Sequence, residues 1–124
     1  MKIAEARVED ARVLFSAGRI ESAAYLCGYA IETALKARIC RTLGWAGFPA
    51  TRKEFERYSS FRTHDLEVLL HLSGMEQTVK ARHVEEWFEV VKWDPESRYT
   101  PLGSANPAEI RLMIDSVAAL VKVL

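Results

Sequence analysis

The chain contains few of the residues that break helices or cross-link small domains. Its 124 residues include only four prolines, six glycines and two cysteines, and 49% of them are hydrophobic. This composition argues against disorder, and the length suits one domain with its own core. Cys27 and Cys40 fall in one expected helix, about 20 Å apart along its axis, which is too far for a disulfide. We therefore expect reduced thiols in a cytoplasmic protein.

The sequence also lacks an excess of charge and any long apolar run. Its 17 basic residues balance its 17 acidic residues, so no overall field attracts nucleic acid, although a local basic patch could do so. Acidic residues near the start of the chain argue against a signal peptide. No apolar run reaches the length of a membrane span, so we expect no membrane association.

Motifs for metal and cofactor chemistry are missing as well. None of the three histidines follows an acidic residue by three positions, as in di-iron bundles, and no Cys or His pair has zinc spacing. Gly44 and Gly47 are not followed by the Lys and Ser/Thr of a phosphate-binding loop, and no serine nucleophile motif is present. We expect no metal, no cofactor, and no hydrolysis by Ser or Cys.

The chain does contain one long segment with helical periodicity, residues 20–43. Small apolar residues recur there at steps of three and four, and Gly28 stands four positions after Ala24. Since so little side-chain bulk lets neighbouring backbones approach, we expect this helix at the centre of a bundle. Glu32 and Lys36 have the order and spacing of a helical ion pair. The apolar positions are Ile20, Ala23, Ala24, Cys27, Ala30, Ile31, Ala34, Leu35 and Ile39.

The two ends of the chain predict helices with clear boundaries. A first helix over residues 2–17 should end at Gly18, whose left-handed conformation turns the chain into the central helix as an antiparallel neighbour. The last helix should begin with Asn106 as its N-cap and Pro107 at its first position.

The middle of the chain predicts shorter helices. A capping box begins a short helix over residues 51–58. Thr63 is the expected N-cap of the next helix, which ends at Gly74. Residues 75–91 predict one further helix with a broad apolar face, which consists of Val79, Val84, Trp87, Phe88 and Val91.

These elements indicate an all-α fold, an up-and-down bundle of four to five helices in a single domain over residues 1–124. The loop over residues 96–105 is longer than most connections in helical bundles. Long ordered loops often carry functional residues. Functional residues are therefore expected in this loop and in the loop before residue 66.

Polar residues in these loops could bind an anion. His64 is expected at a helix N-terminus beside Asp65, and helix N-termini attract anions. Arg57 and Arg62 precede it and can hold phosphate, and Arg98 lies in the longer loop.

A polar cleft forms only if Glu32, His64 and Arg98 meet, and each residue has a simpler alternative. Glu32 and Lys36 could form a surface ion pair, and His64 could only cap its helix. Arg98 could fasten the long loop to Glu32. Tyr99, like two tyrosines of the central helix, could stack on nucleotide bases or line a core or a dimer interface.

Three segments of the chain together carry a family resemblance. They are residues 28–37 (GYAIETALKA), residues 63–66 (THDL) and residues 98–99 (RY). Their order and spacing resemble those of HEPN domains, in which the first segment belongs to the second helix. The resemblance implies a dimer of four- or five-helix bundles. Many HEPN proteins pair with a small nucleotidyltransferase encoded beside them, and many others are metal-independent ribonucleases and toxins.

The resemblance leaves three alternative functions. The first is a nucleotide- or RNA-associated module that acts with a nucleotidyltransferase partner in a toxin–antitoxin or defence system. The second is a metal-independent ribonuclease that uses His64 with Arg57, Arg62 or Arg98. The third is a dimeric scaffold without catalysis.

The ribonuclease members carry an Arg, four to six intervening residues and a His. Arg57 and His64 have six residues between them, but no His follows Arg98, and the whole pattern looks more like the branch thought to bind nucleotides or partner proteins. The catalytic candidates are His64, Arg57 and Arg98. The ligand-binding candidates are Glu32, Lys36, Arg62, Asp65 and Tyr99.

Overall fold

The fold is all-helical in the computed structural model, which describes residues 2–96 and 101–124. No strand occurs in these two ranges, so the predicted all-α class is confirmed. The helices are α1 (Lys2–Ser16), α2 (Ile20–Leu43), α3 (Leu66–Ser73), α4 (Glu76–Arg82), α5 (Val84–Val90) and α6 (Pro107–Val123). Two single 3₁₀ turns, η1 (Glu54–Glu56) and η2 (Ser59–Phe61), lie between α2 and α3.

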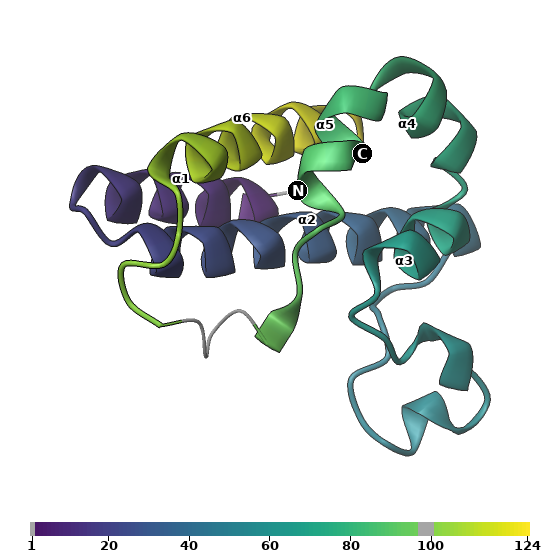
Figure 1. The fold of residues 1–124 in the computed structure, drawn as a ribbon. Helices are drawn as coiled ribbons and strands as arrows, with labels where there is room; N and C mark the ends of the chain where they lie inside the picture. Colours follow the sequence, from purple (N-terminus) through teal and green to yellow (C-terminus); the bar gives the residue numbers. More distant parts are fainter. Residues whose placement is uncertain (1, 97–100) are drawn as a thin grey trace.

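The three long helices α1, α2 and α6 form the body of the bundle (Figure 1). α1 ends just before Gly18, which has a φ of 79°, and the chain reverses at once into α2 as predicted. α6 starts at the predicted cap, since Asn106 Oδ1 accepts hydrogen bonds from the backbone N–H groups of Ala108 and Glu109. No helix in the described ranges is long and apolar enough to cross a membrane.

The helix α2 has the predicted bounds and supplies most of the core. Every predicted apolar position from Ala23 to Ile39 is buried, and Ile20 is half-buried. The close neighbour that Gly28 admits is the indole ring of Trp93, because a Cβ at position 28 would lie 1.9 Å from that ring. Cys27 is buried and Cys40 is half-buried, and both are free thiols.

The single helix predicted over residues 75–91 is wrong, because the structure has two helices there, α4 and α5. His83, with φ −134° and ψ 34°, separates α4 from α5. Val79 and Trp87 are buried as expected, but Val84 and Phe88 are 56% and 61% exposed. The break turns the start of α5, so these two side chains leave the core and reach the surface.

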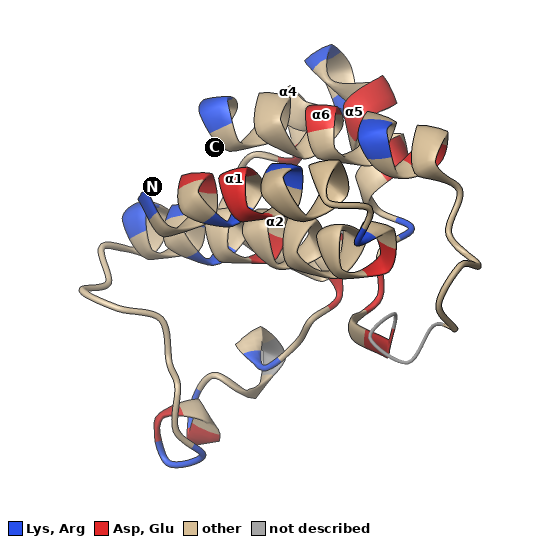
Figure 2. Cartoon of the chain, turned by 90° about the vertical axis from the view of Figure 1, so that its left-hand side faces the viewer, with Lys and Arg blue, Asp and Glu red and all other residues tan. Residues whose placement is uncertain are grey.

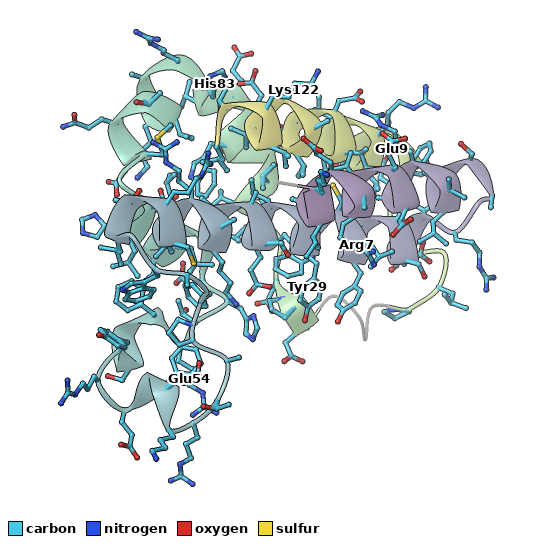
Figure 3. The ribbon with its side chains drawn as sticks, turned by 180° about the vertical axis from the view of Figure 1, so that it is seen from behind. Arg7, Glu9, Tyr29, Glu54, His83 and Lys122 are labelled. Atoms are coloured by element: carbon cyan, nitrogen blue, oxygen red, sulfur yellow. The ribbon has the colours of Figure 1, made fainter. Side chains whose placement is uncertain are left out.

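Residues 44–65, which we call the arm, project from the bundle below α2 and α3 (Figure 1). Figure 2 shows basic and acidic residues next to each other at its tip, and Figure 3 shows Glu54 there. The predicted capping bond exists, since Thr51 Oγ1 accepts the backbone N–H of Glu54 at 3.2 Å. The predicted helix over residues 51–58 is nevertheless wrong, because only the turns η1 and η2 form.

The arm is held together by aromatic rings rather than by a helix. Its ring centroids lie 4.9–6.4 Å apart, mostly in edge-to-face geometry. Trp45, Phe48 and Phe61 also pack against the bundle core, which fixes the arm to the end of α2. The five rings belong to Trp45, Phe48, Phe55, Tyr58 and Phe61.

Candidate functional site

His64 lies immediately before α3, in the last residues of the arm. Asp65, and not Thr63 as predicted, is the N-cap: its Oδ1 accepts the backbone N–H groups of Glu67 and Val68 at 3.0 and 3.3 Å. Thr63 Oγ1 in turn accepts the backbone N–H of Asp65 at 2.9 Å. The carboxylate of Asp65 therefore occupies two N–H groups at the helix N-terminus, where an external anion would have to compete with it.

The imidazole of His64 is held by Glu32 of α2. Its Nδ1 forms a hydrogen bond with Glu32 Oε1, and Lys36 Nζ lies 3.5 Å from the same oxygen. Glu32 is only 2% exposed. Because Glu32 is buried, its contact with Lys36 is not a simple surface ion pair. His64 does not cap α3, since Asp65 is the N-cap, and it contacts Glu32 of α2 instead.

The contact with Glu32 determines which nitrogen of His64 is available for chemistry. An ionised carboxylate only accepts hydrogen bonds, so the Nδ1 of His64 must carry the proton. The Nε2 atom is then free: in the neutral ring it accepts a proton, and in the protonated ring it donates a hydrogen bond to an anion. The side chain of His64 is 57% exposed, so a ligand can reach it.

Basic and aromatic side chains surround His64 in a cavity of about 460 Å³. We call it the His64 cavity. Lys36 Nζ lies 5.2 Å from the centre of the Phe48 ring, and the Arg62 guanidinium lies 6.0 Å from that of Phe55. The lining residues are Lys36, Pro49, Ala50, Phe55, Phe61, Arg62, Thr63 and His64.

A second cavity, of about 510 Å³, is also lined by His64. Residues 64–66 form one wall, and residues 91–96 form the other. Trp93 belongs to that second wall, where it packs against Gly28. Its ring lies 5.4 Å from that of Tyr29, whose side chain is labelled in Figure 3. His64 is therefore the side chain that the two cavities share.

The structure does not place the remaining predicted site residues at either cavity. Arg57 is exposed at the end of η1 and lines neither cavity. Arg98 and Tyr99 fall outside the described ranges. The geometry thus unites Glu32, Lys36, Arg62 and His64, while Asp65 serves as the N-cap beside them.

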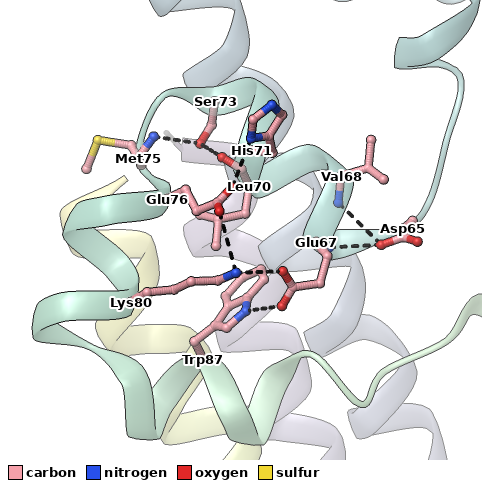
Figure 4. A network of polar contacts seen from close by, with 10 residues as sticks. All are labelled: Asp65, Glu67, Val68, Leu70, His71, Ser73, Met75, Glu76, Lys80 and Trp87. Carbon is pink, nitrogen blue, oxygen red and sulfur yellow. Dashed lines mark hydrogen bonds and ion pairs between the residues drawn. The ribbon is translucent and has the colours of Figure 1, made fainter.

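Sequence reasoning missed a second carboxylate network, which joins α3 to α4 and α5 (Figure 4). Glu67 Oε1 accepts the Trp87 indole N–H at 2.7 Å, and Glu67 Oε2 accepts Lys80 Nζ at 3.0 Å. The indole hydrogen bond and the Lys80 ammonium hold the pKa of Glu67 below its usual value. These partners are 13 and 20 residues away in the chain, so no local spacing signals them.

The described residues offer neither a metal cluster nor a reactive buried thiol. Within residues 2–96 and 101–124, no group of three or more His, Cys, Asp or Glu side chains could hold a metal ion. Burial raises the pKa of the Cys27 thiol to about 12, so this thiol stays protonated at neutral pH and is a poor nucleophile. Neither a metal cluster nor the Cys27 thiol therefore offers reactive chemistry in the described ranges.

Comparison with known families identifies the first part of the chain. The model of the HEPN domain matches residues 1–53. This range contains α1, α2 and the first residues of the arm, and it includes Glu32 and Lys36 but ends before His64. No curated protein and no solved structure matches the chain.

Proposed function

We infer that this chain belongs to the HEPN family over residues 1–53. From this premise we propose that it is a module that binds a nucleotide or an RNA phosphate in the His64 cavity. The family supports the coarse statement that the module is associated with nucleotides or RNA. The finer proposal is a single HEPN-like domain that dimerises and acts with a nucleotidyltransferase partner in a toxin–antitoxin or defence system.

The observation that carries the binding proposal is the buried carboxylate of Glu32. Burying a carboxylate costs free energy, which an apolar residue at the same position would avoid. Glu32 is 2% exposed, yet it holds an imidazole that remains 57% exposed at a cavity. Such an arrangement fixes the ring and presents its second nitrogen to a ligand.

The cavity offers both parts of a nucleotide a suitable surface. Lys36 and Arg62 provide cationic donors for phosphate oxygens, and the protonated ring of His64 can add a third contact through Nε2. Phe55 and Phe61 supply aromatic surface for a base or a ribose. A cavity of about 460 Å³ is large enough for a mononucleotide unit.

A second candidate function, a metal-independent ribonuclease, is favoured by the Glu32–His64 pair. A carboxylate that orients a histidine is a common arrangement for a general base. His64 Nε2 would accept the proton of a ribose 2′-OH. The 2′-oxygen would attack the adjacent phosphorus as the bond from phosphorus to the 5′-oxygen breaks. Water would protonate the departing 5′-oxygen. Arg62, which shares the cavity, would stabilise the phosphate in place of the exposed Arg57.

One titration tests the binding proposal and the ribonuclease alternative together. Fluorescein-labelled single-stranded RNA is titrated with wild-type protein in the presence of a chelator, and anisotropy and chain length are both measured. We expect binding that His64→Ala weakens at least tenfold. His71→Ala is the matched control, because His71 also contacts a glutamate, Glu76 at 3.0 Å, but lies outside the cavity.

The outcomes separate the functions. Binding without cleavage favours the binding module, and cleavage that disappears in His64→Ala establishes the ribonuclease. If folded wild-type protein binds no RNA and no mononucleotide, or if both histidine variants lose binding equally, the proposal is wrong and the dimeric scaffold remains. Co-purification with a nucleotidyltransferase encoded by a neighbouring gene tests the proposed partner.

A further inference from the structure

Several large apolar side chains are exposed in a groove between α5 and α6, which shares no lining residue with the His64 cavity. Its volume is about 630 Å³. Three of its side chains are large and apolar, yet strongly exposed: Val84 at 56%, Phe88 at 61% and Leu112 at 50%. Exposed apolar side chains that gather in one groove commonly mark an interaction surface.

The spacing of the lining residues gives the groove the shape of a helix-binding site. Val84 and Phe88 are four residues apart on α5 and form one wall. Leu112, Ser116 and Ala119 follow one another at steps of four and three on α6 and form the other wall and the floor. The small side chains of Ser116 and Ala119 leave room for bulkier apolar groups from a partner helix.

The rim of the groove is acidic. Glu85, Glu86 and Glu89 of α5 line it, and Figure 2 shows acidic residues on α5. Asp115 of α6 is paired with Arg12 at 3.1 Å. Glu89 is paired with Lys92 at 3.8 Å, and Lys92 Nζ also lies 4.5 Å from the centre of the Phe88 ring.

These pairs leave the rim with unbalanced negative charge. Among the residues that the structure describes, no ion pair engages Glu85 or Glu86. A partner that carries Lys or Arg beside its apolar face would satisfy both carboxylates. A second copy that docked by the same face would instead bring its own Glu85 and Glu86 against them, which is unfavourable.

We propose that the groove between α5 and α6 binds a basic amphipathic helix of another protein. The apolar side chains of that helix would cover Val84, Phe88 and Leu112, and its lysines or arginines would contact Glu85 and Glu86. This mode is the known insertion of an amphipathic helix into an apolar groove. The groove shares no lining residue with the His64 cavity, so the inference stands whether or not that cavity binds RNA.

A pair of synthetic peptides tests the proposal on the full chain. The first is a fluorescein-labelled helical peptide of about 18 residues with leucines at i, i+3, i+4 and i+7 and lysines beside them. The second has glutamate in place of every lysine. We expect the basic peptide to bind at least tenfold more tightly than the acidic one, by anisotropy, and to bind less tightly as salt is raised.

Three protein variants locate the binding. Phe88→Asp and the double variant Glu85→Lys with Glu86→Lys should each weaken binding of the basic peptide at least tenfold. All three positions are on the surface of α5 or at the groove rim, so the fold should survive, which circular dichroism checks. Ile3→Asp on α1 is the control: Ile3 is 68% exposed and lines no part of the groove, so binding should stay unchanged.

The proposal is overturned by three results. One is equal binding of the basic and acidic peptides, and another is no binding of the basic peptide by folded wild-type protein. The third is light scattering that shows a wild-type dimer which Phe88→Asp converts to a monomer, because a second copy would then be the occupant. Loss of peptide binding in Phe88→Asp but not in Ile3→Asp supports the proposal.

Discussion

Two carboxylates of this protein receive the same kinds of donor and do different work. Glu32 contacts a ring nitrogen of His64 and the ammonium of Lys36, while Glu67 accepts a ring N–H from Trp87 and contacts the ammonium of Lys80. The contact of Glu32 with His64 joins α2 to the arm, and the contacts of Glu67 join α3 to α4 and α5. The two regions therefore show how one arrangement serves a candidate site in one place and the fold in another.

The difference lies in the ring and in the burial. The Trp87 indole has a single nitrogen, and once that N–H is bonded to Glu67 no further proton chemistry is possible. The His64 imidazole retains a second nitrogen at a cavity. At the first site the carboxylate is buried and the ring is exposed, whereas at the second the carboxylate is 46% exposed and Trp87 is 4% exposed. The histidine thus keeps a nitrogen exposed at a cavity, whereas the tryptophan ring is packed in the core.

The largest expected effect breaks the packing side of this comparison. Trp87→Ala should lower the free energy of unfolding by about 3 kcal/mol or more, because a large buried ring is lost. Trp87→Phe keeps most of that volume and should cost about 1 kcal/mol for the lost hydrogen bond to Glu67. Urea denaturation measures both. RNA binding by the still-folded protein should be unchanged, and a specific loss of binding in Trp87→Phe would contradict the division of roles.

The next effect breaks the site side. Glu32→Ala should lower the free energy of unfolding by about 2 kcal/mol, because Lys36 and His64 lose a buried partner, and should weaken RNA binding at least tenfold. Glu67→Ala is the matched variant: it should destabilise the protein but leave binding within about twofold. Denaturation and anisotropy on the same samples test this. Equal losses of binding in the two variants would remove the distinction between the carboxylates.

A smaller effect concerns pH and sharpens the description of Glu67. Its pKa in the folded protein is held below the ordinary value of 4.5 by the Trp87 hydrogen bond and by Lys80. The ionised form therefore stabilises the fold above that ordinary value, and this contribution is lost as the pH falls through the folded-state pKa. Glu67→Gln should show a shallower loss of melting temperature than wild type between about pH 6 and about pH 3. Parallel curves would show that the contact has no electrostatic role.

The smallest expected effect is that of His71→Ala. The His71–Glu76 contact resembles the His64–Glu32 contact in its residue types, but both partners are exposed, at 76% and 37%. Exposed pairs of this kind contribute little, so the free energy of unfolding should change by less than about 0.5 kcal/mol. Thermal melts measure this change. A larger loss would mean that exposure alone does not separate the two His–Glu contacts.

The sequence predicted the long helices well because their signals are local. Periodicity and caps lie within a few residues of one another, and they placed α2 and α6 with their bounds. No Gly or Pro lies at or next to His83, so the sequence does not signal the break between α4 and α5. This break accompanies the packing of Trp87 and its bond to Glu67, 20 residues away, which outweighs the local preference for one helix.

The candidate site was predictable to the same extent. The contact between Glu32 and Lys36 follows from their spacing on one helix. His64 and Glu32 are 32 residues apart, so no local spacing predicts their contact. Only the family resemblance grouped the two segments that contain them. Arg62 was chosen for its chemistry, and the aromatic packing of the arm is what brings it to the cavity. That packing depends on rings whose approach no periodic pattern encodes.

Gly28 and Glu32 stand one turn apart on α2, and each seats a different wall of the cavity between His64 and Trp93. The absence of a side chain at position 28 makes room for Trp93, and the carboxylate at position 32 holds His64. A single turn of α2 therefore contacts both walls of this cavity, although the two wall segments lie far apart in the chain. Any rotation or sliding of α2 would carry both walls in the same direction, so the gap would change its position while keeping its width.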